Sequence, residues 1–215
     1  MKMIFFIFAL LILTSFECNN YSNHNTGNVT CDTFYRNDVK SLTDSLGDEL
    51  IAIKPETTTV EKLYSLLLPD TGVNFRNDRH YPRRKSECRK VWVCGRIREI
   101  TISKLDLDSN KDGDLEFQLY GLVHKDEYIN VEMPSTLCSN LNNHSSQELF
   151  KRLKNKIKKH FNFKDDVGSI KVDTDTFVTI EGFIFVDIDY LGKESSRGIT
   201  PVEIHPLTNI SFKKE

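Results

Sequence analysis

The clearest pattern in the chain is an alternation of apolar and polar residues over two stretches joined by an acidic turn. Residues 89–102 and Leu115–Val123 both have the period of two that is typical of a β-strand. The connection between them, Asp106–Asp114, is rich in Asp, Asn and Gly, as expected of a hairpin turn. The pattern therefore predicts a β-hairpin in the middle of the chain.

Further strands are predicted downstream, where apolar runs end at turn-forming residues: Tyr128–Met133, Thr176–Val186 and Val202–Phe212. Gly182 lies inside the second of these runs, at a place where a barrel strand would bend. Between the strands, Ser145 and Glu148 have the spacing of a capping box, and an amphipathic helix is predicted at Ser146–Phe161.

These elements follow one another in the order strand, strand, strand, helix, strand, strand. That order is typical of the OB-fold, a five-stranded Greek-key barrel with its helix between the third and fourth strands. We therefore predict a mainly β domain over residues 89–215, with OB-like topology and without parallel strand pairs.

A helical leader and a basic connector are predicted at residues 38–88. Apolar residues at helical spacing predict a first helix at Asp38–Ile53, which Pro55 ends. Thr58 and Glu61 form a second capping-box pattern and open a second short helix. The following residues 75–90 are strongly basic. They indicate either an anion-binding patch or a solvated loop that leads into an edge strand, and we favour the loop.

The N-terminus has the pattern of an export signal. Lys2 precedes the uncharged apolar run Ile4–Leu13, which is too short to span a bilayer, so residues 1–17 are expected to be a signal peptide. Cys18 follows at once and resembles the acylated cysteine of a bacterial lipoprotein. We favour a membrane-anchored lipoprotein over a secreted protein, with the polar residues 18–37 as a flexible tether.

Export changes how the cysteines are interpreted. If Cys18 carries lipid, four cysteines remain, and an even number in an oxidising compartment favours disulfides. Of the three connectivities, we prefer the one that joins Cys88 to Cys138, because both lie at strand margins. Cys94 lies inside a predicted strand, where a buried free thiol is the alternative.

Several short motifs recur together in one order: Asp112-Gly-Asp114, Val131-Glu-Met-Pro134, Cys138 and Glu203-Ile-His-Pro206. With them, residues 89–212 resemble a family of uncharacterised exported bacterial proteins that have a small OB-like barrel. Glu116 stands where that family usually has His, and the loop before Glu203 is shorter. Since no activity is established for the family, the resemblance implies the fold and export only.

The acidic turn matches the first part of a calcium-binding loop. Asp108, Asn110, Asp112 and Asp114 would supply oxygen ligands around a central glycine. Position twelve of such a loop is normally a bidentate Glu, and here it is Leu119. We therefore expect an ordinary hairpin turn and no cofactor, with calcium as the alternative.

A second group of candidate residues lies near the last strand. Glu203 and His205 share one strand face, and with Asp112, Asp114 or Glu132 they could form a metal or acid–base cluster. We favour a structural role for this pair, because the sequence supplies no nucleophile at a diagnostic spacing. The alternative is a metal-dependent, nuclease-like hydrolase.

OB barrels often bind oligonucleotides or oligosaccharides across their second and third strands. Tyr120, Tyr128 and Phe117 are candidates for stacking on such a ligand, and the helix at Ser146–Phe161 has a basic face. The formal net charge of −2 and the acidic turn disfavour nucleic acid. The favoured function is a non-enzymatic, extracytoplasmic OB module that binds a ligand or protein of the cell envelope.

Overall fold

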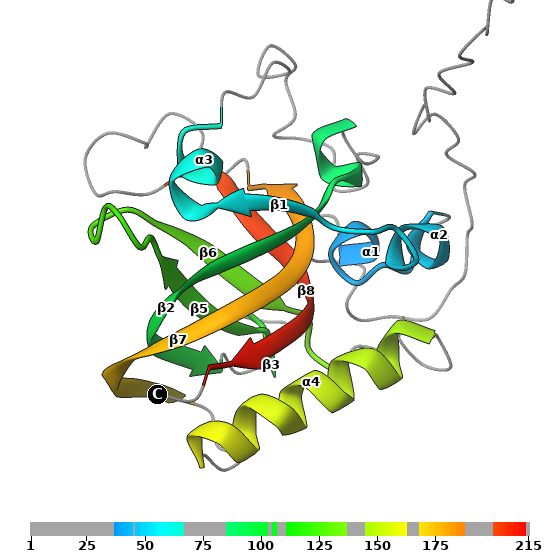
Figure 1. The fold of residues 1–215 in the computed structure, drawn as a ribbon. Coiled ribbons are helices and arrows are strands. Elements are labelled where there is room, and N and C mark those ends of the chain that lie inside the picture. Colours follow the sequence, from blue (N-terminus) through cyan, green and yellow to red (C-terminus); the bar gives the residue numbers. More distant parts are fainter. Residues whose placement is uncertain are drawn as a thin grey trace, which may run out of the picture.

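The fold is known from a computed structural model, which describes residues 37–44, 46–66, 85–102, 105–106, 111–136, 145–162, 168–187 and 200–213. Six strands form its main sheet: β1 (Glu56–Thr59), β2 (Lys90–Ile102), β5 (Leu115–Tyr120), β6 (Tyr128–Met133), β7 (Gly168–Val186) and β8 (Val202–Phe212). Their order is β1-β2-β5-β6-β8-β7, and β7 also pairs with β2, so five strands close into a barrel (Figure 1). The predicted OB-like topology is therefore confirmed.

The remaining elements surround this barrel. They are α1 (Asn37–Lys40), α2 (Gly47–Ile51), α3 (Val60–Tyr64), the 3-10 helix η2 (Lys85–Cys88), α4 (Ser145–Phe161) and the two-residue strands β3 (Leu105–Asp106) and β4 (Lys111–Asp112). The helix α4 stands between the third and fourth barrel strands and lies below the barrel in Figure 1. Phe150, Leu153 and Ile157 are buried on its apolar stripe. Asn162 follows the helix in the left-handed conformation, with φ 52°, as is common just past a helix end.

One part of the fold prediction is wrong, because two strand pairs are parallel. β6 pairs with β8 in parallel, and β1 pairs with β2 in parallel, whereas the other pairs of the barrel are antiparallel. The reason for the first is geometric. A closed ring of five strands cannot alternate direction at every neighbour, so one adjacent pair must run the same way.

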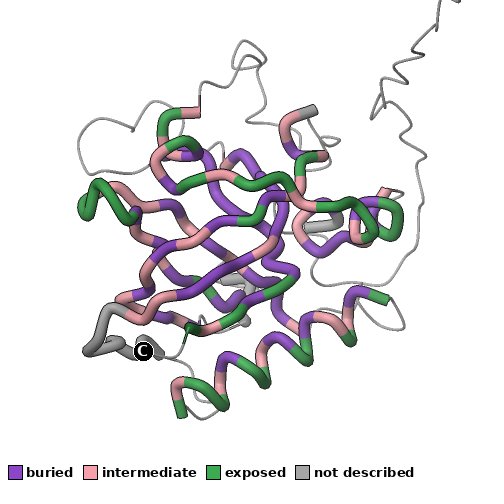
Figure 2. Tube along the Cα trace, in the orientation of Figure 1, coloured by how far each residue is buried: buried purple, intermediate pink, exposed green. Residues whose placement is uncertain are grey.

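The barrel core follows the period-two pattern of the strands. In β5, for example, Leu115, Phe117 and Leu119 are buried while Glu116 is exposed, and the alternation is visible along the strands of Figure 2. Gly182 lies between two register shifts in the pairing of β7 with β8, an irregularity at the position where the sequence predicted a bend. A Cβ atom at this position would lie 2.3 Å from Ile204 Cγ2, which explains the need for glycine.

The leader differs from its prediction. Instead of one helix over Asp38–Ile53, the structure has α1 and α2, and Leu42 between them has a positive φ of 57°. Residues 56–59 form the strand β1, because they pair with the edge of β2, a long-range contact that the local sequence does not encode. The residue that caps α3 is Thr59 rather than Thr58, and its side chain accepts a hydrogen bond of 3.2 Å from the Lys62 amide.

Several predictions fall outside the described residues. These include the signal peptide, Cys18, most of the tether and most of the basic connector. Among the described cysteines, Cys94 has a free thiol 3.3 Å from Thr179 Oγ1. Because Cys138 is not described, its bond to Cys88 stays a prediction. In the part of the chain that the structure describes, no helix is long and apolar enough to cross a membrane.

Candidate functional site

Four ionisable side chains meet where β5, β6 and β8 come together. Asp114 immediately precedes β5, Glu132 is the penultimate residue of β6, and Glu203 and His205 lie two apart on β8. Leu115 pairs with Met133, and Val131 pairs with Ile204. Those registers place the neighbouring acidic residues and His205 side by side. Since Val131 and Ile204 belong to the hydrophobic core, their strand neighbours point to the opposite face of the sheet.

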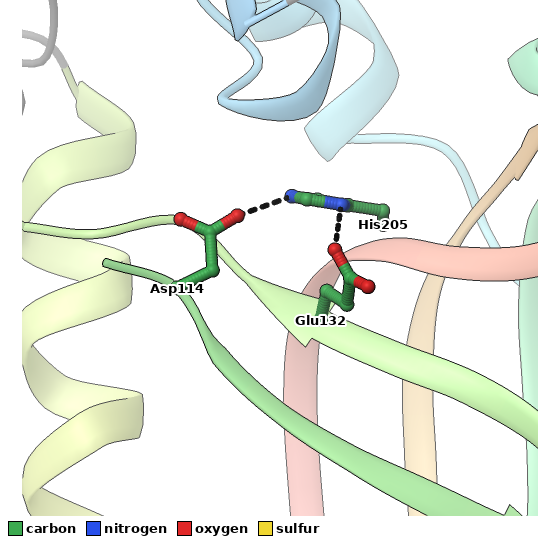
Figure 3. A group of neighbouring side chains, drawn as sticks. All are labelled: Asp114, Glu132 and His205. Carbon is green, nitrogen blue, oxygen red and sulfur yellow. Dashed lines mark ion pairs between the residues drawn. The ribbon is translucent and has the colours of Figure 1, made fainter. Parts of the chain in front are cut away.

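The imidazole of His205 lies at the centre of this cluster. Its Nε2 is 3.5 Å from Asp114 Oδ2, and its Nδ1 is 3.0 Å from Glu132 Oε2. Figure 3 shows the ring between these two carboxylates, one near each ring nitrogen. Glu203 Oε1 is a third carboxylate oxygen, 3.4 Å from Nδ1. We refer to Asp114, Glu132, Glu203 and His205 as the acidic–histidine cluster.

The acidic–histidine cluster is covered from solvent. His205 is 0% exposed and Glu203 is 2% exposed. Lys40 of α1 brings its ammonium to 4.0 Å from Glu132 Oε2 and also lies over the ring of Phe185, a neighbour of His205. The leader therefore contributes the cover and one positive charge, and sequence analysis had not singled out Lys40.

The backbone holds one of the carboxylates in place. The amide of Ser135 donates a hydrogen bond of 2.9 Å to Asp114 Oδ1. The other oxygen, Oδ2, is thereby directed toward His205. In contrast, neither nitrogen of His205 nor Glu203 Oε1 has an aligned hydrogen bond among the described residues, although all three atoms are buried. The cluster thus contains polar atoms that lie close together without satisfying one another.

The protonation of the cluster is strongly perturbed. Burial and the charge on Glu132 raise the pKa of Glu203 to about 8. Burial alone would raise the pKa of Glu132, but its contact with His205 and the Lys40 ammonium outweigh that effect and lower it to about 2. For His205, burial and Lys40 lower the pKa, but the carboxylates of Glu132 and Glu203 outweigh them and raise it to about 9.

This arrangement has two chemical uses. A protonated His205 between ionised carboxylates would join β5, β6 and β8 at one end of the barrel. Alternatively, one imidazole nitrogen and two carboxylate oxygens could coordinate a divalent metal ion. The described residues include a candidate metal group of Asp114, Glu132 and His205, whose ligand atoms all lie within 4.8 Å of one another.

The structure brings together most, but not all, of the residues predicted for this site. Asp114, Glu132, Glu203 and His205 converge. Asp112 pairs with Leu105 in the small β3–β4 sheet, and its side chain lies outside what the structure describes. The other calcium-loop candidates, Asp108 and Asn110, also lie outside the described residues. Leu119, at position twelve of that loop, is buried in the barrel core.

A second surface lies on β5 and β6. Tyr120 and Tyr128 are cross-strand partners, and their ring centroids are 5.3 Å apart. The guanidinium of Arg98 lies 4.1 Å from the centroid of Tyr120, and the Tyr120 hydroxyl donates a hydrogen bond of 2.6 Å to Gln118. Phe117, the third predicted stacking residue, is buried in the core and cannot contact a ligand, so that prediction is wrong. We refer to Arg98, Gln118, Tyr120 and Tyr128 as the tyrosine surface.

The basic segments are largely engaged within the protein where the structure describes them. Arg89 Nε pairs with Glu56 at 2.5 Å, and Lys90 donates to the Ile51 carbonyl at 3.0 Å. On α4, Lys156 donates to the carbonyl of Ile210, and Lys151 pairs with Glu148. The contacts of Arg89, Lys90 and Lys156 connect the leader and α4 to the barrel, whereas the Lys151 pair lies within α4.

Comparison with known proteins finds no match to this chain. No protein-family model, no curated protein and no solved structure matches the chain. The resemblance of residues 89–212 to exported OB-like proteins therefore stays a prediction.

Proposed function

We propose that this protein is a non-enzymatic binding module of the cell envelope, which holds an oligosaccharide on its tyrosine surface. The observation that supports this most directly is the position of Tyr120 and Tyr128. They lie next to each other on the second and third strands of an OB-like barrel, where such barrels commonly bind extended ligands.

The composition of the tyrosine surface favours a sugar over a nucleic acid. Aromatic rings supply flat apolar faces, and Gln118 and the tyrosine hydroxyls supply hydrogen-bonding groups beside them. Arg98 is held against the ring of Tyr120. The chain has a net charge of −2, which gives no general attraction for a phosphate backbone, whereas binding of an uncharged sugar requires none.

The proposal can be tested by titrating the full chain with soluble fragments of cell-wall glycan and following heat release. Tyr120→Ala and Tyr128→Ala should each weaken binding by about 10-fold, the equivalent of about 1.4 kcal/mol for one stacked ring. Trp92→Ala is a matched control, since it removes a partly exposed aromatic ring from β2 outside the tyrosine surface. Equal affinity for all three variants would refute the assignment of this surface. Tighter binding of single-stranded DNA than of glycan would point to nucleic acid instead.

Localisation is part of the same proposal. The apolar run after Lys2 and the position of Cys18 support export and a lipid anchor at Cys18, which would hold the barrel at a membrane surface. Metabolic labelling with a fatty acid, compared between the wild type and Cys18→Ala, tests the anchor. Label in the wild type alone supports it, and no label in either protein would leave secretion as the answer.

A metal-dependent hydrolase is the second candidate. The convergence of Asp114, Glu203 and His205 with Glu132 favours it, because such clusters activate water in metal hydrolases. However, His205 is fully buried and Lys40 lies 4.0 Å from Glu132, so a substrate could reach the cluster only if the residues that cover it moved. Phosphodiester hydrolysis with added Mn²⁺ or Zn²⁺ that is lost in Glu203→Gln would support this candidate over the binding module.

A further inference from the structure

We infer that the acidic–histidine cluster is a binding site for one divalent transition-metal ion, with Asp114, Glu132 and His205 as ligands and Glu203 as a positioning residue. This site shares no residue with the tyrosine surface, and its assignment does not depend on the proposed function. Its basis is the geometry, burial and formal charge of the cluster.

The spacing of His205 Nε2 and Asp114 Oδ2 suits an ion better than a direct hydrogen bond. His205 Nε2 and Asp114 Oδ2 are 3.5 Å apart, which is long for a hydrogen bond between these groups. Two ligand atoms at about 2.1 Å from a tetrahedral ion stand about 3.4 Å from each other. The ligand atoms of Asp114, Glu132 and His205 all fall within 4.8 Å of one another, so small side-chain rotations would bring all three to one ion.

The cluster also contains the unsatisfied atoms that a ligand would complete. His205 is fully buried, and neither of its nitrogens makes an aligned hydrogen bond among the described residues. The ring nevertheless lies between the Asp114 and Glu132 carboxylates (Figure 3). Nε2 lies 3.5 Å from Asp114 Oδ2 and makes no hydrogen bond among the described residues, and a metal bond to this nitrogen would satisfy it.

The residues that contact Asp114 and His205 are arranged like those that orient metal ligands in other proteins. Ser135 holds Asp114 Oδ1, and Oδ2 faces His205 Nε2 as the coordinating oxygen. Glu203 Oε1 is 3.4 Å from His205 Nδ1, the nitrogen opposite the one that faces Asp114. A carboxylate at the second nitrogen of a metal-bound imidazole fixes the orientation of the ring. Glu132 Oε2 is also near Nδ1, at 3.0 Å, but it belongs to the candidate metal group with Asp114 and His205, whereas Glu203 does not. Glu203 is therefore assigned a positioning role rather than a direct bond.

Formal charge and ligand chemistry indicate the class of ion. The three carboxylates carry three negative charges when ionised, and Lys40 supplies one positive charge at 4.0 Å from Glu132. A divalent ion would supply the other two charges. A site with one imidazole and carboxylate oxygens suits Zn²⁺, Co²⁺ or Mn²⁺ rather than Ca²⁺ or Mg²⁺, which prefer oxygen alone.

The test uses the full chain after treatment with a chelator and dialysis. It is titrated with Co²⁺ alone, and visible absorption is followed at one fixed pH, because metal ligands must be deprotonated to bind. Zn²⁺ is then added to displace Co²⁺. We expect saturation at one ion per chain and an absorption spectrum of four- or five-coordinate Co²⁺, displaced stoichiometrically by Zn²⁺.

Variants identify the ligands. Asp114→Asn keeps an acceptor for the Ser135 amide, so it should fold, and it should weaken Co²⁺ binding by about 100-fold or more. Glu132→Gln should have a similar effect, and Glu203→Gln should weaken binding by about 10-fold to 100-fold, as expected of a residue that orients a ligand. Glu148→Gln, at an exposed carboxylate on α4, is the matched control and should bind as the wild type does.

The result that overturns the inference is the absence of saturable Co²⁺ or Zn²⁺ binding by the folded wild type. Equal affinities for the wild type, Asp114→Asn and Glu132→Gln would overturn it as well. If a cluster variant fails to fold by circular dichroism, the stoichiometry and spectrum of the wild type still decide the question. Glycan binding is measured separately on the tyrosine surface, so failure of either proposal leaves the other standing.

Discussion

Replacing Gly182 with alanine should destabilise the barrel and displace the acidic–histidine cluster. The added Cβ would lie 2.3 Å from Ile204 Cγ2 and 2.7 Å from the carbonyl oxygen of Pro206. Carbon atoms in contact normally stand about 3.5–4.0 Å apart, so β7 and β8 must separate by about 1 Å at this point. Ile204 is fully buried and lies between Glu203 and His205, so the movement would be transmitted to both.

The expected loss of stability in Gly182→Ala follows from these contacts. Overpacking a close-packed core typically costs about 1–3 kcal/mol, and a clash with backbone and a buried β-branched side chain belongs at the upper end. For a chain of this size, about 3 kcal/mol lowers the melting temperature by about 6–12 °C. Differential scanning calorimetry of Gly182→Ala and the wild type measures this difference. In the same sample, Co²⁺ affinity should fall, because the ligand geometry would be disturbed.

Gly121→Ala is the matched control. Its Cβ would lie 2.5 Å from Glu61 Oε1, the end of a flexible side chain that can rotate away. The rotation would break the hydrogen bond that the Val123 amide donates to Glu61, which would lower the free energy of unfolding by about 1 kcal/mol. A melting temperature of Gly182→Ala that equals that of Gly121→Ala would refute the packing argument. In an Ile204→Ala background, Gly182→Ala should cost less, because one of its two clashes is gone.

The other predictions concern stability and metal dependence. In chelated protein, the free energy of unfolding should decrease from pH 6.5 to 8, because folded Glu203 and His205, with pKa values of about 8 and about 9, keep protons that the unfolded chain has released. Denaturant titrations should show a slope of up to about −1.4 kcal/mol per pH unit for each proton, and Glu203→Gln should remove its share; a stability that rises with pH would contradict this. Phe150→Ala should cost about 3–5 kcal/mol in the same assay, because Phe150 is fully buried under the barrel, whereas Leu149→Ala, half-buried beside it, should cost less. Calcium should leave the melting temperature unchanged, since Leu119 provides no oxygen ligand; a calcium-dependent rise that Asp112→Ala abolishes would show the acidic turn to be a calcium site.

Local pattern was enough to locate most of the barrel. The strands β6 and β8 have the predicted bounds, and α4 begins one residue before its predicted start, because alternation and helical spacing directly record which side chains face the core. The topology followed from element order, since few arrangements of five strands and one helix bury those faces. The tyrosine pair was also predictable, because residues on the outer face of adjacent hairpin strands become neighbours once the strands pair.

Tertiary structure decided the rest, because it depends on contacts between residues far apart in the chain. The polar run Glu56–Thr59 has no core-facing alternation, and it is a strand only because the edge of β2 accepts it. The first part of β7, residues 168–175, pairs with the end of β2, so this strand begins before its predicted start at Thr176. The sequence grouped Glu203 with His205 and left Asp112, Asp114 and Glu132 as alternative partners. Only the pairing of β6 with both β5 and β8 placed Asp114 and Glu132 beside that pair, and only the docking of α1 added Lys40 and buried the cluster.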